Sequence, residues 1–285
     1  MAVIQWFPGH MAKAKREISE KVKMVDLIIE LKDARIPYSS TNPMVDEIVG
    51  DKPRLILLCK SSIADPKVTK RWMEYYKEKN ILSLDIDSIS NYNIKNVVPY
   101  CRLALKELFE KRKAKGIMNN QIKAIIMGIP NVGKSTIINT LAKRKACNVG
   151  DKPGVTKSQT WIKITDDLLL LDTPGILWPK FEDQEVGYKL AMCGSIKDEI
   201  LDLEEVCKKS LEYIKNEYPD LLKSRYNLDY LEEDPQDILE QIGKKRGCIL
   251  KGGIIDISRA CTIVMNELRG MKRGAMSYEK PEDRN

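Results

Sequence analysis

The sequence predicts an α/β fold in which a mostly parallel sheet is followed by a C-terminal all-α helical domain. Three observations support this prediction. Strand-like apolar runs alternate with helical stretches in the first part of the chain, a glycine-rich loop joins one of these runs to a helix, and residues 184–285 show helical patterns. With 285 residues, the chain is long enough for about two domains.

Strands and helices alternate before the glycine-rich loop. We expect strands at residues 24–31, 54–59 and 81–86, and helices from near residue 12, at 68–79 and at 94–113. This alternation is typical of a parallel sheet, because parallel neighbours need a long crossover connection. The polar residues 115–121 contain one glycine and are predicted to be a linker.

A strand-like run ends at Gly128 and leads into a GxxxxGK(S/T) loop, which is followed by a helical apolar face. This is the pattern of a P-loop in its required context, and a chance glycine-rich turn is the alternative. Glycines let backbone N–H groups approach phosphates, and the helix N-terminus favours an anion. Lys134 is expected to reach the β- and γ-phosphates, and Ser135 to bind Mg²⁺. The predicted phosphate-binding residues are Asn131, Val132, Gly133, Lys134, Ser135 and Thr136.

Two later segments complete the predicted phosphate site. Thr156 lies where a loop could fold back to Mg²⁺ and the γ-phosphate. A predicted hairpin, residues 161–164 and 168–171, leads into the sequence DTPG. Its aspartate, Asp172, can hold Mg²⁺ through water, and the backbone N–H of Gly175 can meet the γ-phosphate. DTPG alone could be a tight turn, but together with the P-loop it predicts a nucleotide switch.

The order of these parts is unusual. The segments that could bind a base, residues 55–65 and 83–88, precede the P-loop at residues 128–136 instead of following it. A parallel sheet can be cut in one connection and rejoined elsewhere, because chain termini often lie close together. We therefore predict a circularly permuted GTPase domain over residues 1–183 and a helical domain over residues 184–285.

Several motifs together resemble one family. They are WFPGHM at 6–11, DARIP at 33–37, GIPNVGKST at 128–136, DKPGVT at 151–156 and LLDTPGILWPKFED at 170–183. These stretches, spread over nearly the whole chain, resemble bacterial ribosome biogenesis GTPase A, the YlqF group. The resemblance implies a GTP hydrolase that acts in assembly of the large (50S) ribosomal subunit, with a helical domain that helps to contact rRNA.

The predicted base-binding motif departs from the family pattern. The family has N-K-A-D in the first loop and Asn-Ser in the second. The corresponding residues here are Cys59, Lys60, Ser61 and Ser62, and Asp87 and Ser88. A serine accepts one modest neutral hydrogen bond where an aspartate accepts a bidentate, charge-assisted pair. The alternative function is therefore an RNA- or ribosome-binding assembly factor with weak or non-guanine-specific nucleotide binding.

Hydrolysis needs a group that positions water, and Ile176 stands where glutamine often does so. In the family this part has been assigned to an N-terminal histidine, which corresponds to His10, the only histidine here. His10 could act on the water or only respond to the ribosome. We assign the catalytic parts to His10, Lys134 and Thr156. In related P-loops the asparagine at position 131 supports a K⁺ ion, which makes K⁺ a further candidate cofactor.

The net charge of +7 permits a nucleic-acid partner without proving one. Several lysines and arginines lie in clusters along the chain, but such basic clusters are more often solvated helix faces than binding surfaces. The RNA-contact candidates are Lys244, Lys245, Arg246, Arg269, Lys272 and Arg273. The partner itself, a 50S precursor and its rRNA, is implied by the resemblance.

Other features of the sequence bear on the compartment. The seven cysteines are scattered without a CxxC pair, which indicates reduced thiols rather than a zinc site. No apolar run is long enough to span a membrane, and the N-terminus has no apolar signal region. We expect a cytoplasmic monomer.

Overall fold

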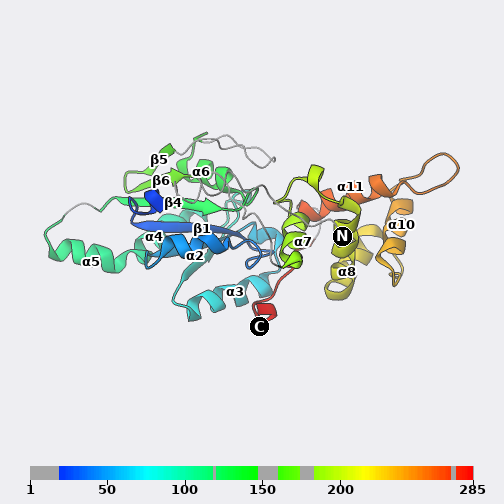
Figure 1. Ribbon diagram of the computed structural model, residues 1–285, viewed down its shortest axis with the longest axis horizontal. Coiled ribbons are helices and arrows are strands. Elements are labelled where there is room, and N and C mark those ends of the chain that lie inside the picture. The colour runs from blue at the N-terminus through cyan, green and yellow to red at the C-terminus, as the bar shows by residue number, and fades with distance from the viewer. Residues whose placement is uncertain (1–18, 118–119, 147–159, 174–182, 271–273, 285) are drawn as a thin grey trace.

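The computed structural model describes residues 19–117, 120–146, 160–173, 183–270 and 274–284. Its sheet has six strands in the order β3-β2-β1-β4-β6-β5 (Figure 1). They are β1 (Leu27–Asp33), β2 (Arg54–Cys59), β3 (Leu82–Asp85), β4 (Ile122–Gly128), β5 (Thr160–Thr165) and β6 (Leu168–Asp172). Neighbouring strands are parallel, except that β5 and β6 form an antiparallel hairpin. The predicted α/β fold is confirmed.

Helices cover both faces of the sheet. On one face, alternate residues of β1 and β4 form a core with α4 (Val97–Ala104) and α6 (Lys134–Ala142). On the other face, Ile28 packs with α2 (Pro43–Val49), and β2 packs with α3 (Pro66–Glu78). Because both faces are buried, the central strands have almost continuous apolar sequences.

The P-loop follows β4, which lies between β1 and β6. The strands that precede it in the sequence lie on one side of β4, and the strands that follow it lie on the other. This is the connectivity predicted for a circularly permuted domain. It also places a change of strand order beside the P-loop, where open α/β sheets bind their ligands.

The predicted single helix at residues 94–113 is wrong. The chain instead forms η2 (Ile94–Asn96), α4 and, after a break at Leu105, α5 (Lys106–Ala114). Leu105 is fully buried in the sheet core, whereas no residue of α5 is buried. The chain therefore turns at Leu105 and keeps this side chain in the core. The charged sequence of α5 gives no sign of this turn. Helix α2 was also not predicted.

After the sheet comes a group of helices with no named strand among the described residues (Figure 1). They are α7 (Gln184–Met192), η3 (Asp198–Ile200), α8 (Leu203–Glu217), α9 (Pro219–Tyr226), α10 (Pro235–Lys245) and α11 (Ile257–Arg269). Helices α8, α10 and α11 pack against one another. Asp256 caps α11 by accepting a hydrogen bond from the N–H of Arg259 at 3.0 Å.

Residues 274–280, here called the C-terminal strap, leave the helices and return to the sheet (Figure 1). The N–H of Met276 donates to the carbonyl of Ile63 at 3.1 Å, and the N–H of Tyr278 donates to the carbonyl of Arg35 at 2.8 Å. The strap therefore lies against the loops that follow β1 and β2. None of the helices described here is long and apolar enough to cross a membrane.

Candidate nucleotide-binding site

The backbone of the P-loop depends on two glycines. At Gly128, an added Cβ would lie 3.0 Å from the side chains of Leu31 and Val132, so the close approach of β4 to β1 needs a residue without a side chain. Gly133 has φ of 101°, in the region that favours glycine. Its neighbour Lys134 begins α6, so the loop ends at a helix N-terminus with N–H groups available to an anion.

Lys134 and Asp172 meet inside the site. The ammonium of Lys134 forms an ion pair with the carboxylate of Asp172, and these residues are 7% and 3% exposed. The contact follows from the sheet, since Ile126 of β4 is the register partner of Asp172 in β6. The hydroxyl of Thr173 donates to the carbonyl of Ile126 at 2.8 Å and joins the two strand ends.

The donors expected for Mg²⁺ are chemically suitable. Ser135, half-buried in the first turn of α6, offers a hydroxyl oxygen, and Asp172 offers a carboxylate. Mg²⁺ prefers such oxygen ligands and usually binds through one or two protein groups plus phosphates and water. The other predicted residues of this part of the site, Thr156, Gly175 and His10, lie outside the described residues.

Asn131 connects the P-loop to the helices. Its φ is 57°, and its side-chain amide donates to the carbonyl of Gly194 at 2.8 Å. Gly194 lies in the turn that follows α7. The structure thus gives Asn131 a positioning contact that the sequence did not indicate, while a role in K⁺ binding stays a prediction.

The predicted base loop follows β2. Cys59 is buried at the end of the strand, its thiol lies 3.4 Å from the carbonyl of Leu57, and burial raises the thiol pKa well above its usual value. Lys60 has φ of 59°, and its ammonium donates to Asp33 at 3.0 Å. This lysine is therefore fixed by the aspartate that ends β1.

Asp33 and Arg35 form a buried pair that sequence reasoning missed. Their ion pair is 2.7 Å long, and the guanidinium also donates to the carbonyls of Leu268 and Cys193, each at 3.4 Å. Burial alone would raise the pKa of Asp33, but Arg35 and Lys60 hold it well below its usual value. The available signal was two opposite charges directly after a buried strand.

The second base loop follows β3 and touches the first. The hydroxyl of exposed Ser62 donates to the carboxylate of Asp87, which also accepts hydrogen bonds from the N–H groups of Ile89 at 2.7 Å and Ser90 at 3.0 Å. Burial alone would raise the pKa of Asp87, but these hydrogen bonds hold it below its ordinary value. Ser88, half-buried, lies in the same turn.

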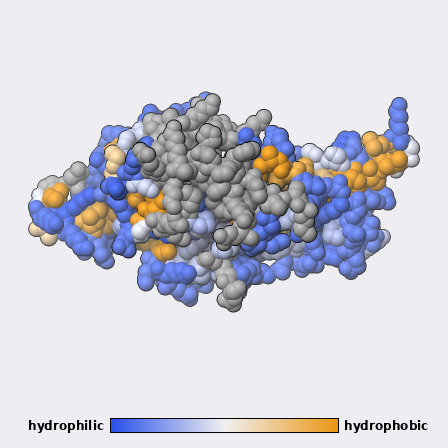
Figure 2. Space-filling view, in the orientation of Figure 1, coloured by the Kyte–Doolittle hydropathy of each residue, from blue (hydrophilic) through white to orange (hydrophobic). Residues whose placement is uncertain are grey.

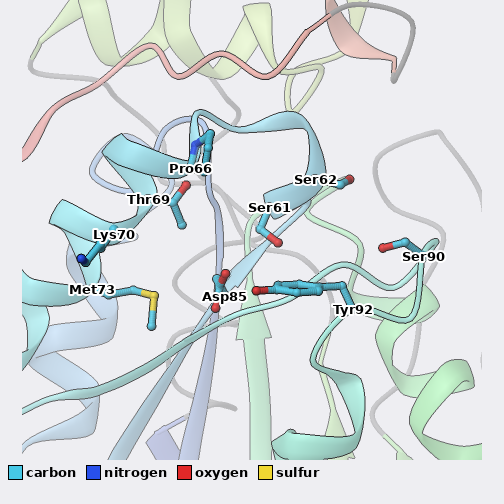
Figure 3. Close-up of a pocket in the computed structure, with 9 residues that line it drawn as sticks. All are labelled: Ser61, Ser62, Pro66, Thr69, Lys70, Met73, Asp85, Ser90 and Tyr92. Atoms are coloured by element: carbon cyan, nitrogen blue, oxygen red, sulfur yellow. The ribbon is translucent and has the colours of Figure 1, made fainter.

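A pocket of about 390 Å³ lies beside the base loops (Figure 3). Its lining residues are Ser61, Ser62, Pro66, Thr69, Lys70, Met73, Asp85, Ser90 and Tyr92. In Figure 3, Ser61 points toward Asp85 whereas Ser62 points away from it. The charge of Asp85 raises the pKa of Tyr92. The side chains of these neighbouring serines therefore point in different directions, and Ser62 is the one that contacts the second base loop.

The predicted RNA-contact residues divide into two groups. Lys244 and Lys245 are exposed on the last turn of α10. Arg246 is paired with Glu267 at 3.2 Å, and Arg269 is paired with Asp198 at 2.8 Å. These two arginines hold the helical region together. Lys272 and Arg273 lie outside the described residues.

Comparisons with known proteins agree with this geometry. A family model described as "50S ribosome-binding GTPase" matches residues 123–241. The chain is similar to ribosome biogenesis GTPase A of Bacillus cereus, with 51% identity covering 99% of this chain and 95% of that protein. Its counterpart in Thermotoga maritima is 31% identical over 98% of this chain and 95% of its own length.

Two solved structures share the fold. The crystal structure of GNP-bound YlqF from T. maritima has 29% identity and a TM-score of 0.68, covering 95% of this chain and 99% of that chain. The GDP-bound structure of TM YlqF has 27% identity and a TM-score of 0.67, covering 94% of this chain and 100% of that chain. Both likenesses extend through the sheet and the helices that follow it.

Proposed function

This chain belongs to the ribosome biogenesis GTPase A family, and from that premise we propose that it hydrolyses GTP with Mg²⁺ during assembly of the large (50S) ribosomal subunit. The observation that carries the proposal is the buried contact between Lys134 and Asp172 beside the P-loop. It brings an ammonium and a carboxylate, the groups that bind phosphate and metal in P-loop nucleotide hydrolases, to one point at the edge of the sheet.

The residues would divide the chemistry as follows. Backbone N–H groups of the P-loop and Lys134 bind the phosphates, and Ser135 and Asp172 hold Mg²⁺. The ion, when bound, neutralises phosphate charge. Thr156 and Gly175 are proposed to close on the γ-phosphate, and His10 to orient the attacking water. We further propose that the ribosomal particle stimulates hydrolysis by holding the segments around Thr156 and Gly175 in a hydrolytic arrangement.

We propose a 50S precursor and its rRNA as the partner and the cytoplasm as the compartment. The matched family model and the relatives' names support a ribosomal partner. Among the predicted contacts, Lys244 and Lys245 suit a polyanion best because they are exposed on the last turn of one helix.

A second candidate function is an rRNA-binding factor with little base selectivity. It is favoured by Ser62, which offers a neutral hydroxyl at the position of the family's aspartate. Under this alternative, the protein would act mainly by occupying rRNA, and nucleotide identity would matter little.

Phosphate release from GTP and from ATP, each measured with and without 50S particles, tests the proposal. We expect GTP hydrolysis to be faster than ATP hydrolysis and to rise with particles. Lys134→Ala should abolish it, whereas Lys67→Ala, an exposed lysine on α3, should not. Equal rates with both nucleotides would favour the second candidate. If no condition gave Lys134-dependent phosphate release, the proposed GTP hydrolysis would be excluded and only the rRNA-binding function would stand.

A further inference from the structure

Ser62 presents a problem of recognition. Guanine carries a donor N–H at ring position 1, whereas adenine has an acceptor lone pair there. A free serine hydroxyl is both donor and acceptor, because its hydrogen rotates to suit the partner. Such a hydroxyl would bind either ring and would distinguish them poorly. Discrimination therefore depends on what fixes the hydroxyl hydrogen.

The structure fixes it. The Ser62 hydroxyl donates to the carboxylate of Asp87, so its hydrogen points into the protein and its lone pairs are left toward solvent. Asp87 is 3% exposed, and the backbone N–H groups of Ile89 and Ser90 hold its other oxygen. This carboxylate cannot turn away without giving up both backbone hydrogen bonds.

The Ser62 hydroxyl lies at the edge of the sheet where a base would reach. The P-loop follows β4 and the two base loops follow β2 and β3, and these parallel strands end at the same edge. Ligands of open α/β sheets bind at this edge, next to the change of strand order. A nucleotide with its phosphates in the P-loop can extend its ring along the edge toward the exposed Ser62.

We propose that Ser62, with its hydrogen held by Asp87, is an acceptor-only contact that selects purines carrying a ring N–H, guanine and hypoxanthine, over adenine. This inference rests on the proposed function and names the residues that give it base selectivity. Ser62 is the specificity-determining residue, and Asp87 is a positioning residue that acts through it. Position 62 lacks the family's carboxylate, but Asp87 on the facing loop supplies one. This carboxylate acts on the base indirectly, through its hydrogen bond with Ser62.

Asp87→Asn tests the positioning role. The asparagine amide can donate to Ser62 and release the serine hydrogen, which then can donate to adenine. Calorimetric titration of the full chain with GDP, IDP and ADP should show GDP affinity lowered about tenfold and ADP affinity raised about threefold. General damage to the loop would lower all three affinities together, so opposite changes identify the hydrogen-bond effect.

Two further sets of variants check the contact itself. Ser62→Thr keeps the hydroxyl and should keep the selectivity. Ser62→Val has the shape of the threonine variant without the hydroxyl, and it should lose the preference for GDP and IDP. Ser62→Asp alone places two carboxylates in contact and should weaken GDP binding. Adding Asp87→Asn to Ser62→Asp should restore GDP binding at least to the level of the wild type.

The outcomes separate the inference from the function on which it rests. If the wild type prefers GDP over ADP and Asp87→Asn leaves that ratio unchanged, the inference is wrong and the proposed function stands. If Ser62→Val keeps the wild-type preference, the inference is also wrong. If the wild type binds none of the three nucleotides with Mg²⁺ present, the proposed function fails, and the inference fails with it.

Discussion

The ion pair between Lys134 and Asp172 is almost fully enclosed, and removing one partner should leave the other charge buried without compensation. We expect Asp172→Asn to lower the free energy of unfolding by about 3 kcal/mol in nucleotide-free protein. Urea denaturation measures this quantity. Arg102→Ala is the matched control, because its pair with Asp167 is about half exposed and should contribute less than about 1 kcal/mol. Equal losses in the two variants would contradict the prediction.

Asp33 predicts a dependence of stability on pH. Its folded pKa lies below the unfolded value of about 3.9, so its stabilising effect is fully present above that pH and is lost as pH falls toward the folded pKa. Asp33→Asn should therefore be less stable than the wild type at neutral pH, because Arg35 and Lys60 lose their partner. The two stabilities should converge in acid, where the wild-type side chain is protonated. Parallel curves of unfolding free energy against pH would refute this.

At the scale of elements, the strands that consist of one continuous apolar run were predicted best from the sequence. Strand β2 and the hairpin of β5 and β6 occur where expected, because buried apolar runs bounded by polar turns are local signals. The bend at Leu105 depends on burial against a sheet made from other segments. The contact of Ser62 with Asp87 joins two loops that only strand pairing brings together. Neither can be obtained from local sequence.

The position of the C-terminal strap could likewise not be predicted from the sequence pattern, because backbone groups make many of its contacts. Its sequence has no period, yet Tyr278 is 1% exposed and its ring lies 5.5 Å from that of Tyr213. The division of the chain at residue 183 stays a prediction. The strap lies after residue 183 in the sequence, yet it contacts the loops that follow β1 and β2 in the sheet.

The strap can be tested through its buried tyrosine. We expect Tyr278→Ala to lower the free energy of unfolding by about 3 to 5 kcal/mol, as other large-to-small core substitutions do. Tyr230 is 59% exposed, and Tyr230→Ala should change stability by less than about 0.5 kcal/mol. Chemical denaturation of both variants provides the comparison. A small loss for Tyr278→Ala would show that the strap is not held as described.

At the scale of the whole molecule, Asn131 and Arg35 join the sheet to the helices. The side-chain amide of Asn131 in the P-loop donates to the carbonyl of Gly194, and the guanidinium of Arg35 donates to the carbonyls of Cys193 and Leu268. The phosphate loop and the base loop are thus both connected to the region between α7 and α11. A change in either loop is expected to alter how the helices present Lys244 and Lys245.

Electrostatics predicts how those lysines would act on RNA. Replacing both Lys244 and Lys245 by alanine should weaken binding to a 50S precursor and reduce the slope of log K against log salt by roughly 1.4 to 1.8. The double variant of Lys67 and Lys77, exposed on α3, is the matched control and should leave the slope unchanged. Filter binding across a salt series measures both. Identical slopes for all proteins would remove these lysines from the RNA interface.

The mutual neutralisation of Lys134 and Asp172 has a consequence for ligand uptake. An anion that draws the ammonium away leaves the carboxylate unbalanced, and a divalent cation that takes the carboxylate leaves the ammonium unbalanced. Each ligand alone therefore meets an opposing electrostatic cost that the other removes. Triphosphate and metal should enter synergistically, each raising the apparent affinity for the other by the same factor.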